Sequence, residues 1–326
     1  MIQDLYVIET AQCDPYHNLA LEKALFDHVR DKEMILYLWQ NEKTVVIGRN
    51  QSAHNECNLS ALKEDGGVLA RRLSGGGAVY HDTGNLNFTF LSHEENFDTA
   101  KQNEVLLCAL KKFGLPAEIS GRNDLLIQGK KFSGHAYLHH NRHAMHHGTI
   151  MLNVNTDALA RYLNVSLLKL RDKHVASVRS RVINLKEILP SLTVKMLKEA
   201  LKEAFAEVYQ KECKTLSEEE LNRDEILHNT AFFADPAFLF GKEKQLPYAA
   251  EERFAFGMLR IEYDLCDNRI TDAAVYSDAL DTEYLSSLAP KLLGQNIQDI
   301  TLEATNETEV MMNEALTELI ERSKCQ

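Results

Sequence analysis

The sequence lacks the features that would assign it directly to several classes of protein. Its six cysteines form no C-x-x-C or other close pair, which excludes a zinc ribbon and a dense disulfide framework. No apolar run approaches the roughly 20 residues of a membrane-spanning helix, and the N-terminus has no basic stretch followed by an apolar core, as a secretory signal has. We therefore expect reduced thiols, no membrane span and a cytoplasmic location.

The common nucleotide and hydrolase motifs are also missing. The P-loop pattern G-x-x-x-x-G-K-[ST] is absent, because Lys131 follows Gly129-Lys130 and no glycine precedes it at the required spacing. The G-x-G-x-x-G fingerprint and the G-x-S-x-G nucleophile elbow are absent too. A nucleotide would bind outside the P-loop and Rossmann frameworks, and Ser-His-Asp catalysis has little support.

An overall excess of positive charge is also missing. With 36 Lys and Arg against 48 Asp and Glu, the formal net charge is −12, which argues against a general nucleic-acid binder. Residues 251–326 hold 6 basic and 16 acidic residues, a balance of −10. Residues 121–186 instead hold 11 basic and 3 acidic residues, a balance of +8. One segment is therefore suited to anions, and the C-terminal segment is not.

The 326 residues suggest two domains, and their helices and strands mix without regular alternation, which favours an α+β class over a doubly wound sheet. Asp14 and Pro15 predict the N-cap and first residue of a helix. Residues 34–39 and 44–47 predict a hairpin, and the alternation over residues 86–90 predicts a strand buried on one face. Further helices are predicted at residues 98–113, 191–212, 281–293 and 307–321, and further strands at residues 68–73, 78–81, 125–127, 149–152, 254–264 and 269–276.

The most informative motif is the glycine-rich stretch that begins at Arg71 and Arg72 and continues Leu-Ser-Gly-Gly-Gly-Ala-Val-Tyr-His-Asp between predicted strands. Three glycines let backbone amides approach a ligand closely, successive free amides form an anion-binding concavity, and the two arginines add fixed charge. The combination suits a carboxylate, a phosphate or both. A hairpin turn with two surface arginines is the plainer alternative.

A second polar cluster runs from Asn123 and Asp124 to Lys130 and Lys131. A carboxylate at the head of a strand is suited to Mg²⁺, which takes one or two carboxylates together with phosphate oxygens and water. Asn123 is suited to hydrogen-bond a carbonyl or hydroxyl of a ligand. In a regular strand the two lysines point to opposite sides, so one faces the ligand and the other faces solvent. Taken alone, a polar turn with a lysine pair is the plainer interpretation.

Six of the thirteen histidines lie between residues 135 and 147. His139 and His143 have the i, i+4 spacing of metal ligands, but this window contains no Asp, Glu or Cys and resembles a hairpin loop, so a metal site is the weaker interpretation. We predict that one of His146 and His147 points inward and that the loop histidines are solvated.

In this order, these motifs resemble the lipoate–protein ligase A family. Several ordered motifs are more specific than any one alone, and the resemblance covers nearly the whole chain. It is carried by residues 44–50, 56–58, 71–82, 84–88, 121–124, 131–134, 146–149, 177–182 and 253–257.

The resemblance implies a biotinyl/lipoyl-ligase-like catalytic domain over residues 1–246, with a mixed, largely antiparallel sheet and flanking helices. A small acidic α+β accessory domain would follow over residues 247–326. The implied substrates are ATP, with Mg²⁺, and lipoate, which form lipoyl-AMP before the lipoyl group passes to a lysine of an acceptor. The implied acceptors are dehydrogenase lipoyl domains or a glycine-cleavage H protein, with no nucleic acid and no membrane as partner.

The family's motifs also imply the site residues. Lys131 would be the catalytic residue that touches the lipoyl carbonyl and the phosphate, His147 would border the lipoate, and Asp124 would hold Mg²⁺. The adenylate would be bound by Arg72, Gly75, Gly76, Gly77, Ala78, Val79, Tyr80, Asn123 and Lys131.

Three alternatives stay open. A transferase that moves octanoyl or lipoyl groups between carriers through a thioester needs a cysteine in the region of residues 121–124, and residues 109–212 contain none. A biotin ligase has a different glycine-rich signature. A non-catalytic nucleotide or metal sensor built on the histidines needs no lysine at the carbonyl, so Lys131 argues against it.

Overall fold

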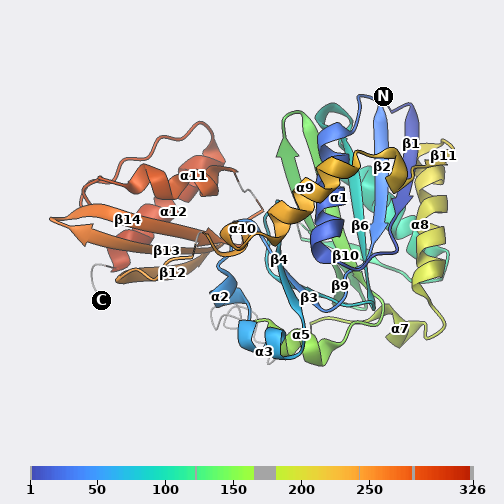
Figure 1. Ribbon diagram of the computed structural model, residues 1–326, viewed down its shortest axis with the longest axis horizontal. Helices are drawn as coiled ribbons and strands as arrows, with labels where there is room; N and C mark the ends of the chain where they lie inside the picture. The colour runs from blue at the N-terminus through green and yellow to red at the C-terminus, as the bar shows by residue number, and fades with distance from the viewer. Residues whose placement is uncertain (1, 122, 165–180, 242, 281–282, 324–326) are drawn as a thin grey trace.

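The computed structural model describes residues 2–121, 123–164, 181–241, 243–280 and 283–323 (Figure 1). Its largest element within these residues is an eight-stranded sheet in which β1 is parallel to both of its neighbours and the other strands are antiparallel. The expected α+β class with a mixed, largely antiparallel sheet is therefore confirmed. The strands in order across the sheet are β11 (Cys213–Thr215), β1 (Asp4–Glu9), β2 (Glu33–Trp39), β6 (Asn85–His93), β10 (His143–Met151), β9 (Lys130–His140), β8 (Asp124–Ile127) and β7 (Glu118–Ser120).

Helices cover both faces of this sheet. On one face, α4 (Thr99–Lys111) and α8 (Val194–Tyr209) pack on a core that includes Phe88 and Phe90 of β6. On the other face, α1 (Pro15–His28) and α9 (Arg223–Ala234) lie side by side (Figure 1) over a second core. As predicted, the side chain of Asp14 caps α1 by accepting the Tyr16 N–H, with Pro15 at the first helical position.

A smaller sheet of three strands carries the glycine-rich loop. Its central strand β3 (Thr44–Ile47) is parallel to β4 (Val68–Arg71) and antiparallel to β5 (Val79–His81). The hairpin predicted between β2 and β3 is therefore wrong, because these strands belong to different sheets. Asn41, in the connection, is fully buried and accepts a 3.0 Å hydrogen bond from Asn18 of α1, so this connection is an anchored crossover.

Short helices complete this unit of the chain. Around the smaller sheet and the end of the larger one lie α2 (Ala53–Glu56), α3 (Leu59–Glu64), α5 (Thr156–Tyr162), α7 (Leu185–Ile188), α10 (Pro236–Phe240) and the 3₁₀ turns Glu94–Asn96 and Glu218–Glu220.

The strand β6 is buried on both faces, although its alternation predicted one buried face. Leu86, Phe88 and Phe90 enter the α4/α8 core as expected, but Asn87 and Thr89 are also at most 1% exposed. The second face is covered by α1 and packs polar groups there, and these groups hydrogen-bond one another. Polar residues on that face therefore indicate a buried polar network.

A separate C-terminal unit has its own sheet and core. The strands β12 (Tyr248–Phe254), β13 (Gly257–Cys266) and β14 (Arg269–Ser277) form an antiparallel sheet. Two helices, α11 (Glu283–Leu292) and α12 (Glu307–Ser323), pack on it. The chain reverses at Asp267 and Asn268, which have φ values of 49° and 60° as a tight two-residue hairpin turn requires. The domain boundary after residue 246 stays a prediction.

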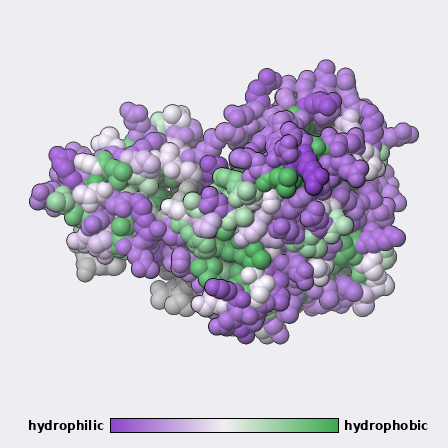
Figure 2. Space-filling model, viewed as in Figure 1, coloured by the Kyte–Doolittle hydropathy of each residue, from purple (hydrophilic) through white to green (hydrophobic). Residues whose placement is uncertain are grey.

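The two units touch through backbone hydrogen bonds. The Ser277 N–H donates to the Asn50 carbonyl at 2.9 Å, and the Gly76 N–H donates to the Ala279 carbonyl at 3.0 Å. The face shown in Figure 2 is largely hydrophilic, with apolar side chains gathered near the place where the two units meet. None of the helices in the described part of the chain combines the length and the apolar character needed to cross a membrane.

Candidate active site

A cavity of about 130 Å³ lies between the eight-stranded sheet and the smaller sheet. One part of its wall is apolar and includes Leu19, Trp39 and Val46. The other part is polar and contains most of the predicted site residues. Of these, the cavity is lined by Arg72, Gly76, Gly77, Ala78, Val79, Asn123, Lys131 and His147.

Three predicted site residues do not line the cavity. Gly75 lies beneath the C-terminal unit, where a Cβ would come within 2.3 Å of the Ala279 carbonyl oxygen. Tyr80 is buried with its ring 5.4 Å from that of Tyr162. Asp124 contacts Lys131 from the side. Two parts of the family motifs, residue 122 and residues 177–180, lie outside the described residues.

Glycine is required at two facing positions of the glycine-rich loop. Gly76 has a φ of +91°, a backbone conformation that residues other than glycine rarely adopt. A Cβ on Gly48, across the loop, would lie 2.2 Å from the Gly76 carbonyl oxygen. The two backbones therefore touch, and the amides of the loop are held at the cavity by this contact.

Arg72 shapes the loop from within. Its Nε donates to Ser74 Oγ at 3.1 Å, and its Nη2 donates to the Gly77 carbonyl at 2.9 Å. Burial lowers the pKa of Arg72 to about 10, so the guanidinium stays charged at neutral pH. The residue thus brings a fixed positive charge to the cavity wall while its donors hold loop carbonyls.

Arg71 has a different role from the one that its sequence position suggested. It lies on the opposite side of β4, since successive side chains of a strand alternate, and it is 2% exposed. Its guanidinium donates to the carbonyls of Gln51, at 2.6 Å, and Leu239, at 3.2 Å. The expectation that both arginines flank the anion site is therefore wrong for Arg71, which fixes the surrounding loops.

Lys131 reaches the cavity from the start of β9, whereas Lys130 is exposed to solvent, as the alternation predicted. Lys131 Nζ lies 2.7 Å from Asp124 Oδ1. Gly134 leaves room for the lysine, because a Cβ there would lie 2.8 Å from Nζ. Asn123, beside this pair, donates through Nδ2 to the His135 carbonyl at 3.0 Å. The ammonium group is thus held against one carboxylate at the cavity wall.

His146 and His147 are both buried, so the prediction that one of them points inward was incomplete. They lie on opposite faces of β10: His146 Nδ1 is 2.9 Å from Gln102 Oε1 of α4, and His147 Nδ1 is 2.9 Å from Glu22 Oε1 of α1. His147 Nε2 is also 2.6 Å from Ser74 Oγ. The glycine-rich loop is therefore connected to a buried carboxylate through His147.

Sequence reasoning missed Glu22 and Trp39. Glu22 is 4% exposed and stands on the side of α1 that also buries Leu19 and Phe26. Glu22 lies three residues after Leu19 and four residues before Phe26, so it is on the apolar face of the helix. A carboxylate on an apolar helix face is the sequence signal that could have identified it.

Two further histidines of the cavity wall are held neutral. Burial, together with the nearby charge of Lys131, lowers the pKa of His135 to about 3. Burial, together with the nearby charge of Arg72, lowers the pKa of His81 to about 3 as well. Both rings therefore act as neutral polar groups beside the ammonium and the guanidinium.

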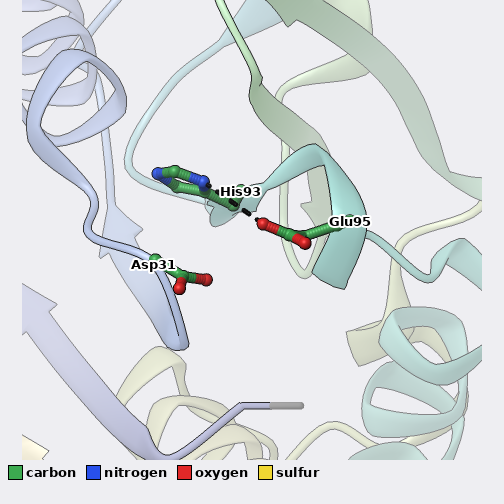
Figure 3. Close-up of side chains that lie close together, drawn as sticks. All are labelled: Asp31, His93 and Glu95. Atoms are coloured by element: carbon green, nitrogen blue, oxygen red, sulfur yellow. Dashed lines mark ion pairs between the residues drawn. The ribbon is translucent and has the colours of Figure 1, made fainter.

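The histidines at the β9–β10 hairpin form no metal site at His139 and His143. His139 Nδ1 lies 2.7 Å from a carboxylate oxygen of Glu94, and the His143 ring packs on that of His93. Within the described residues, one group of side chains brings potential metal-ligand atoms together. It consists of Asp31, His93 and Glu95, whose ligand atoms lie within 4.8 Å of one another (Figure 3). We assign no metal to it, because both carboxylates are exposed and that of Glu95 lies 3.6 Å from Arg142.

Comparison with known families gives two matches along the chain. Residues 14–206 match the lipoyl protein ligase A/B catalytic domain. Residues 245–322 match the bacterial lipoate protein ligase C-terminus.

Individual relatives agree with these matches. Lipoate-protein ligase A of Psychrobacter cryohalolentis is 38% identical over 296 residues, covering 88% of this chain and 87% of the relative. Lipoate-protein ligase A of Blochmanniella floridana is 35% identical over 310 residues, covering 92% and 91%. Among solved structures, P. falciparum LipL1 in complex with lipoate aligns with a TM-score of 0.83 and 29% identity, covering 96% of this chain and 99% of that one. A bipartite ligase with its E2 lipoyl domain from Thermoplasma acidophilum aligns at 0.64 and 26%, covering 76% and 99%.

Proposed function

The chain belongs to the lipoate–protein ligase A family, and from this premise we propose that it is an ATP-dependent lipoate–protein ligase. One observation supports this function above others. Lys131 and the glycine-rich loop face the same cavity as the apolar side chains of Leu19 and Trp39. A ligand with a hydrocarbon body and an anionic end matches such a wall.

In the first step, a carboxylate oxygen of lipoate attacks the α-phosphate of ATP, and pyrophosphate leaves with the electrons of the broken P–O bond. Negative charge accumulates on oxygens at the junction of the two substrates, where preorganised donors contribute most. The Lys131 ammonium is placed to stabilise the lipoyl carboxyl and the phosphate together. The backbone amides from Gly77 to Val79 are suited to the phosphate.

Two buried hydrogen-bond donors of the cavity wall have no acceptor within the described residues. His81 Nε2 and Asn87 Nδ2 have no hydrogen-bond partner among the residues that the structure describes. Buried polar groups without partners are unfavourable, so a bound ligand with acceptor atoms at these positions would be stabilised. This supports a polar ligand in the cavity.

In the second step, the neutral ε-amine of an acceptor lysine attacks the carbonyl carbon of lipoyl-AMP, and AMP leaves with the electrons of the broken C–O bond. The nitrogen releases one proton to solvent as the amide bond forms. The carbonyl oxygen gains charge, which the Lys131 ammonium again stabilises. Asp124, beside Lys131, is the carboxylate suited to hold Mg²⁺, since this ion takes one or two carboxylates together with phosphate oxygens. When bound, the ion would neutralise negative charge on the phosphates.

The partners that we propose are lipoyl-accepting proteins, either dehydrogenase lipoyl domains or a glycine-cleavage H protein. The Thermoplasma acidophilum ligase solved with its E2 lipoyl domain supports the first class. The thioester-forming transferase is disfavoured, because none of the cysteines in the described residues lines the cavity. The cytoplasmic location stays a prediction from the sequence.

The function is tested by lipoate-dependent exchange of labelled pyrophosphate into ATP. We expect exchange with lipoate and ATP, and transfer of the lipoyl group to a lipoyl domain when one is added. Biotin in place of lipoate is the matched control. Folded protein that shows no lipoate-dependent exchange would falsify the ligase assignment, and exchange with biotin alone would select a biotin ligase.

A further inference from the structure

A continuous series of buried hydrogen bonds joins α1 to the glycine-rich loop. Glu22 Oε1 lies 2.9 Å from His147 Nδ1, and His147 Nε2 lies 2.6 Å from Ser74 Oγ. Ser74 Oγ in turn accepts from Arg72 Nε at 3.1 Å. All four residues are at most 7% exposed. The series therefore runs from a buried carboxylate to a buried guanidinium with no solvent between them.

The chemistry of the two ends fixes the direction of the outer bonds. A guanidinium only donates, so the Arg72 N–H occupies one of the two acceptor sites of Ser74, and the serine hydroxyl donates to His147 Nε2 when that nitrogen carries no proton. An ionised carboxylate only accepts, so His147 must carry its proton on Nδ1 to meet Glu22. A neutral ring in this position is therefore the tautomer with Nδ1 protonated and Nε2 bare.

A second branch holds the carboxylate itself. Trp39 Nε1 donates to Thr89 Oγ1 at 3.0 Å, and Thr89 Oγ1 donates to Glu22 Oε1 at 2.6 Å. Glu22 thus makes two hydrogen bonds through one oxygen, and such partners compensate for the burial of a polar group. The charge of Glu22 also favours the charged form of Arg72.

We infer that Glu22 is a positioning residue of the adenylation step. Through His147 and Ser74 it fixes Arg72, and Arg72 holds the carbonyls of Gly75 and Gly77, so that the amides of the loop face the cavity. The arrangement resembles a Ser-His-acid triad in its bonds. However, Ser74 is fully buried and accepts from a cation, so its hydroxyl serves to hold the loop. This inference rests on the proposed function.

The experiment compares Glu22→Leu and Ser74→Ala with the wild-type protein in two measurements. Pyrophosphate exchange reports the adenylation rate, and ¹⁵N NMR of histidine-labelled protein reports the His147 tautomer, with His147→Asn used to assign its signals. We expect Glu22→Leu to lose the preference for the Nδ1-protonated tautomer and to lower the exchange rate by about ten- to a hundredfold, as expected for a lost hydrogen bond to a charged group. Ser74→Ala should lower the rate similarly while the tautomer stays, because Glu22 still holds Nδ1.

Two further variants separate positioning from packing. Glu22→Gln keeps an acceptor oxygen, so it should retain the tautomer and restore most of the rate. Gln102→Leu is the matched control: it removes the partner of His146, the neighbouring buried histidine on the other face of β10, and should leave the rate unchanged.

The inference is wrong if Glu22→Leu keeps the wild-type exchange rate or the wild-type tautomer, or if Gln102→Leu slows exchange as much as Glu22→Leu. If Glu22→Leu does not fold, a Ser74→Ala variant with the wild-type rate overturns it equally. A wild-type protein without exchange would overturn the proposed function instead, and the tautomer in the resting protein would still test the hydrogen-bond order.

Discussion

Lys131 is the side chain on which the proposed chemistry depends most directly. We predict that Lys131→Ala lowers lipoate-dependent exchange by at least about a hundredfold, because it removes a preorganised positive charge from the reacting oxygens. Its side chain is 38% exposed, so the truncation leaves the core intact. Lys131→Arg should not restore activity, since a planar guanidinium does not fit the space that Gly134 leaves for an ammonium.

Lys130→Ala is the control for this prediction. Lys130 precedes Lys131 on the same strand but is exposed to solvent, so its removal should leave exchange near the wild-type rate. Circular dichroism of both variants checks the fold. A folded Lys131→Ala protein with near-normal turnover would show that the catalytic lysine has been misassigned.

At this scale the sequence predicts well what lies within one motif. Lys131 and Arg72 were found because their neighbours in the chain are also their neighbours in space. Glu22 was missed because its partner His147 is 125 positions away in the sequence, and that contact depends on how β10 lies against α1. That Arg71 points away from the cavity into the surrounding loops was missed for the same reason, because the carbonyls it meets belong to residues 51 and 239.

At the scale of elements, periodicity and capping residues predict several helices and strands, such as α1, α4, α8 and β6, but neither α9 nor β9, and they do not predict how the strands pair. The strands at residues 34–39 and 44–47 were predicted where they occur, yet they pair in different sheets. What separates them is the burial of Asn41 against α1, a long-range contact that no local pattern shows. Likewise, the polar residues on β6 and β10 indicate a solvated face from the sequence alone, whereas in the structure α1 covers this face.

The buried histidines give these strands a definite response to acid. The pKa of His135 is about 3 in the folded chain and about 6.5 in an unfolded one. Between these two pH values, His135 is protonated in the unfolded chain and neutral in the folded chain. The stability that depends on the neutral ring is present above about pH 6.5 and is lost as the pH falls toward 3. At pH 5 the loss is about 2 kcal/mol.

We therefore predict that His135→Gln reduces the difference in unfolding free energy between pH 7.5 and pH 5 by about 2 kcal/mol, measured by urea denaturation at both pH values. The glutamine amide can still meet Ser133, which lies 3.0 Å from the ring in the native protein. His139→Asn, at an exposed histidine of the same strand, is the control and should change this difference little. An unchanged pH dependence in His135→Gln would show that the folded chain protonates this ring as readily as the unfolded chain does.

At the scale of the whole molecule, the excess of negative charge is concentrated in the C-terminal unit, whereas the segment that carries Lys131 is basic. The C-terminal residues 251–326 carry a balance of −10, while residues 121–186, which include Lys131, carry +8. The units meet at the glycine-rich loop, where the Gly76 N–H donates to the Ala279 carbonyl. Gly76 is one of the residues that the resemblance implies for the adenylate, and its N–H is already occupied by the C-terminal unit.

This occupation predicts competition between the ligand and the contact of the two units. If a phosphate oxygen takes the Gly76 N–H, the Ala279 carbonyl has to leave, and the neighbouring hydrogen bond from Ser277 N–H to the Asn50 carbonyl should open more often. We expect saturating lipoate with an ATP analogue that has a methylene bridge between its α- and β-phosphates to speed hydrogen exchange at the Ser277 amide, measured by mass spectrometry or NMR. Gly75→Ala should speed it without ligand, because a Cβ there would lie 2.3 Å from the Ala279 oxygen. Equal exchange with and without ligand would mean that the adenylate binds while this contact stays closed, so the loop would hold the phosphate through amides other than that of Gly76.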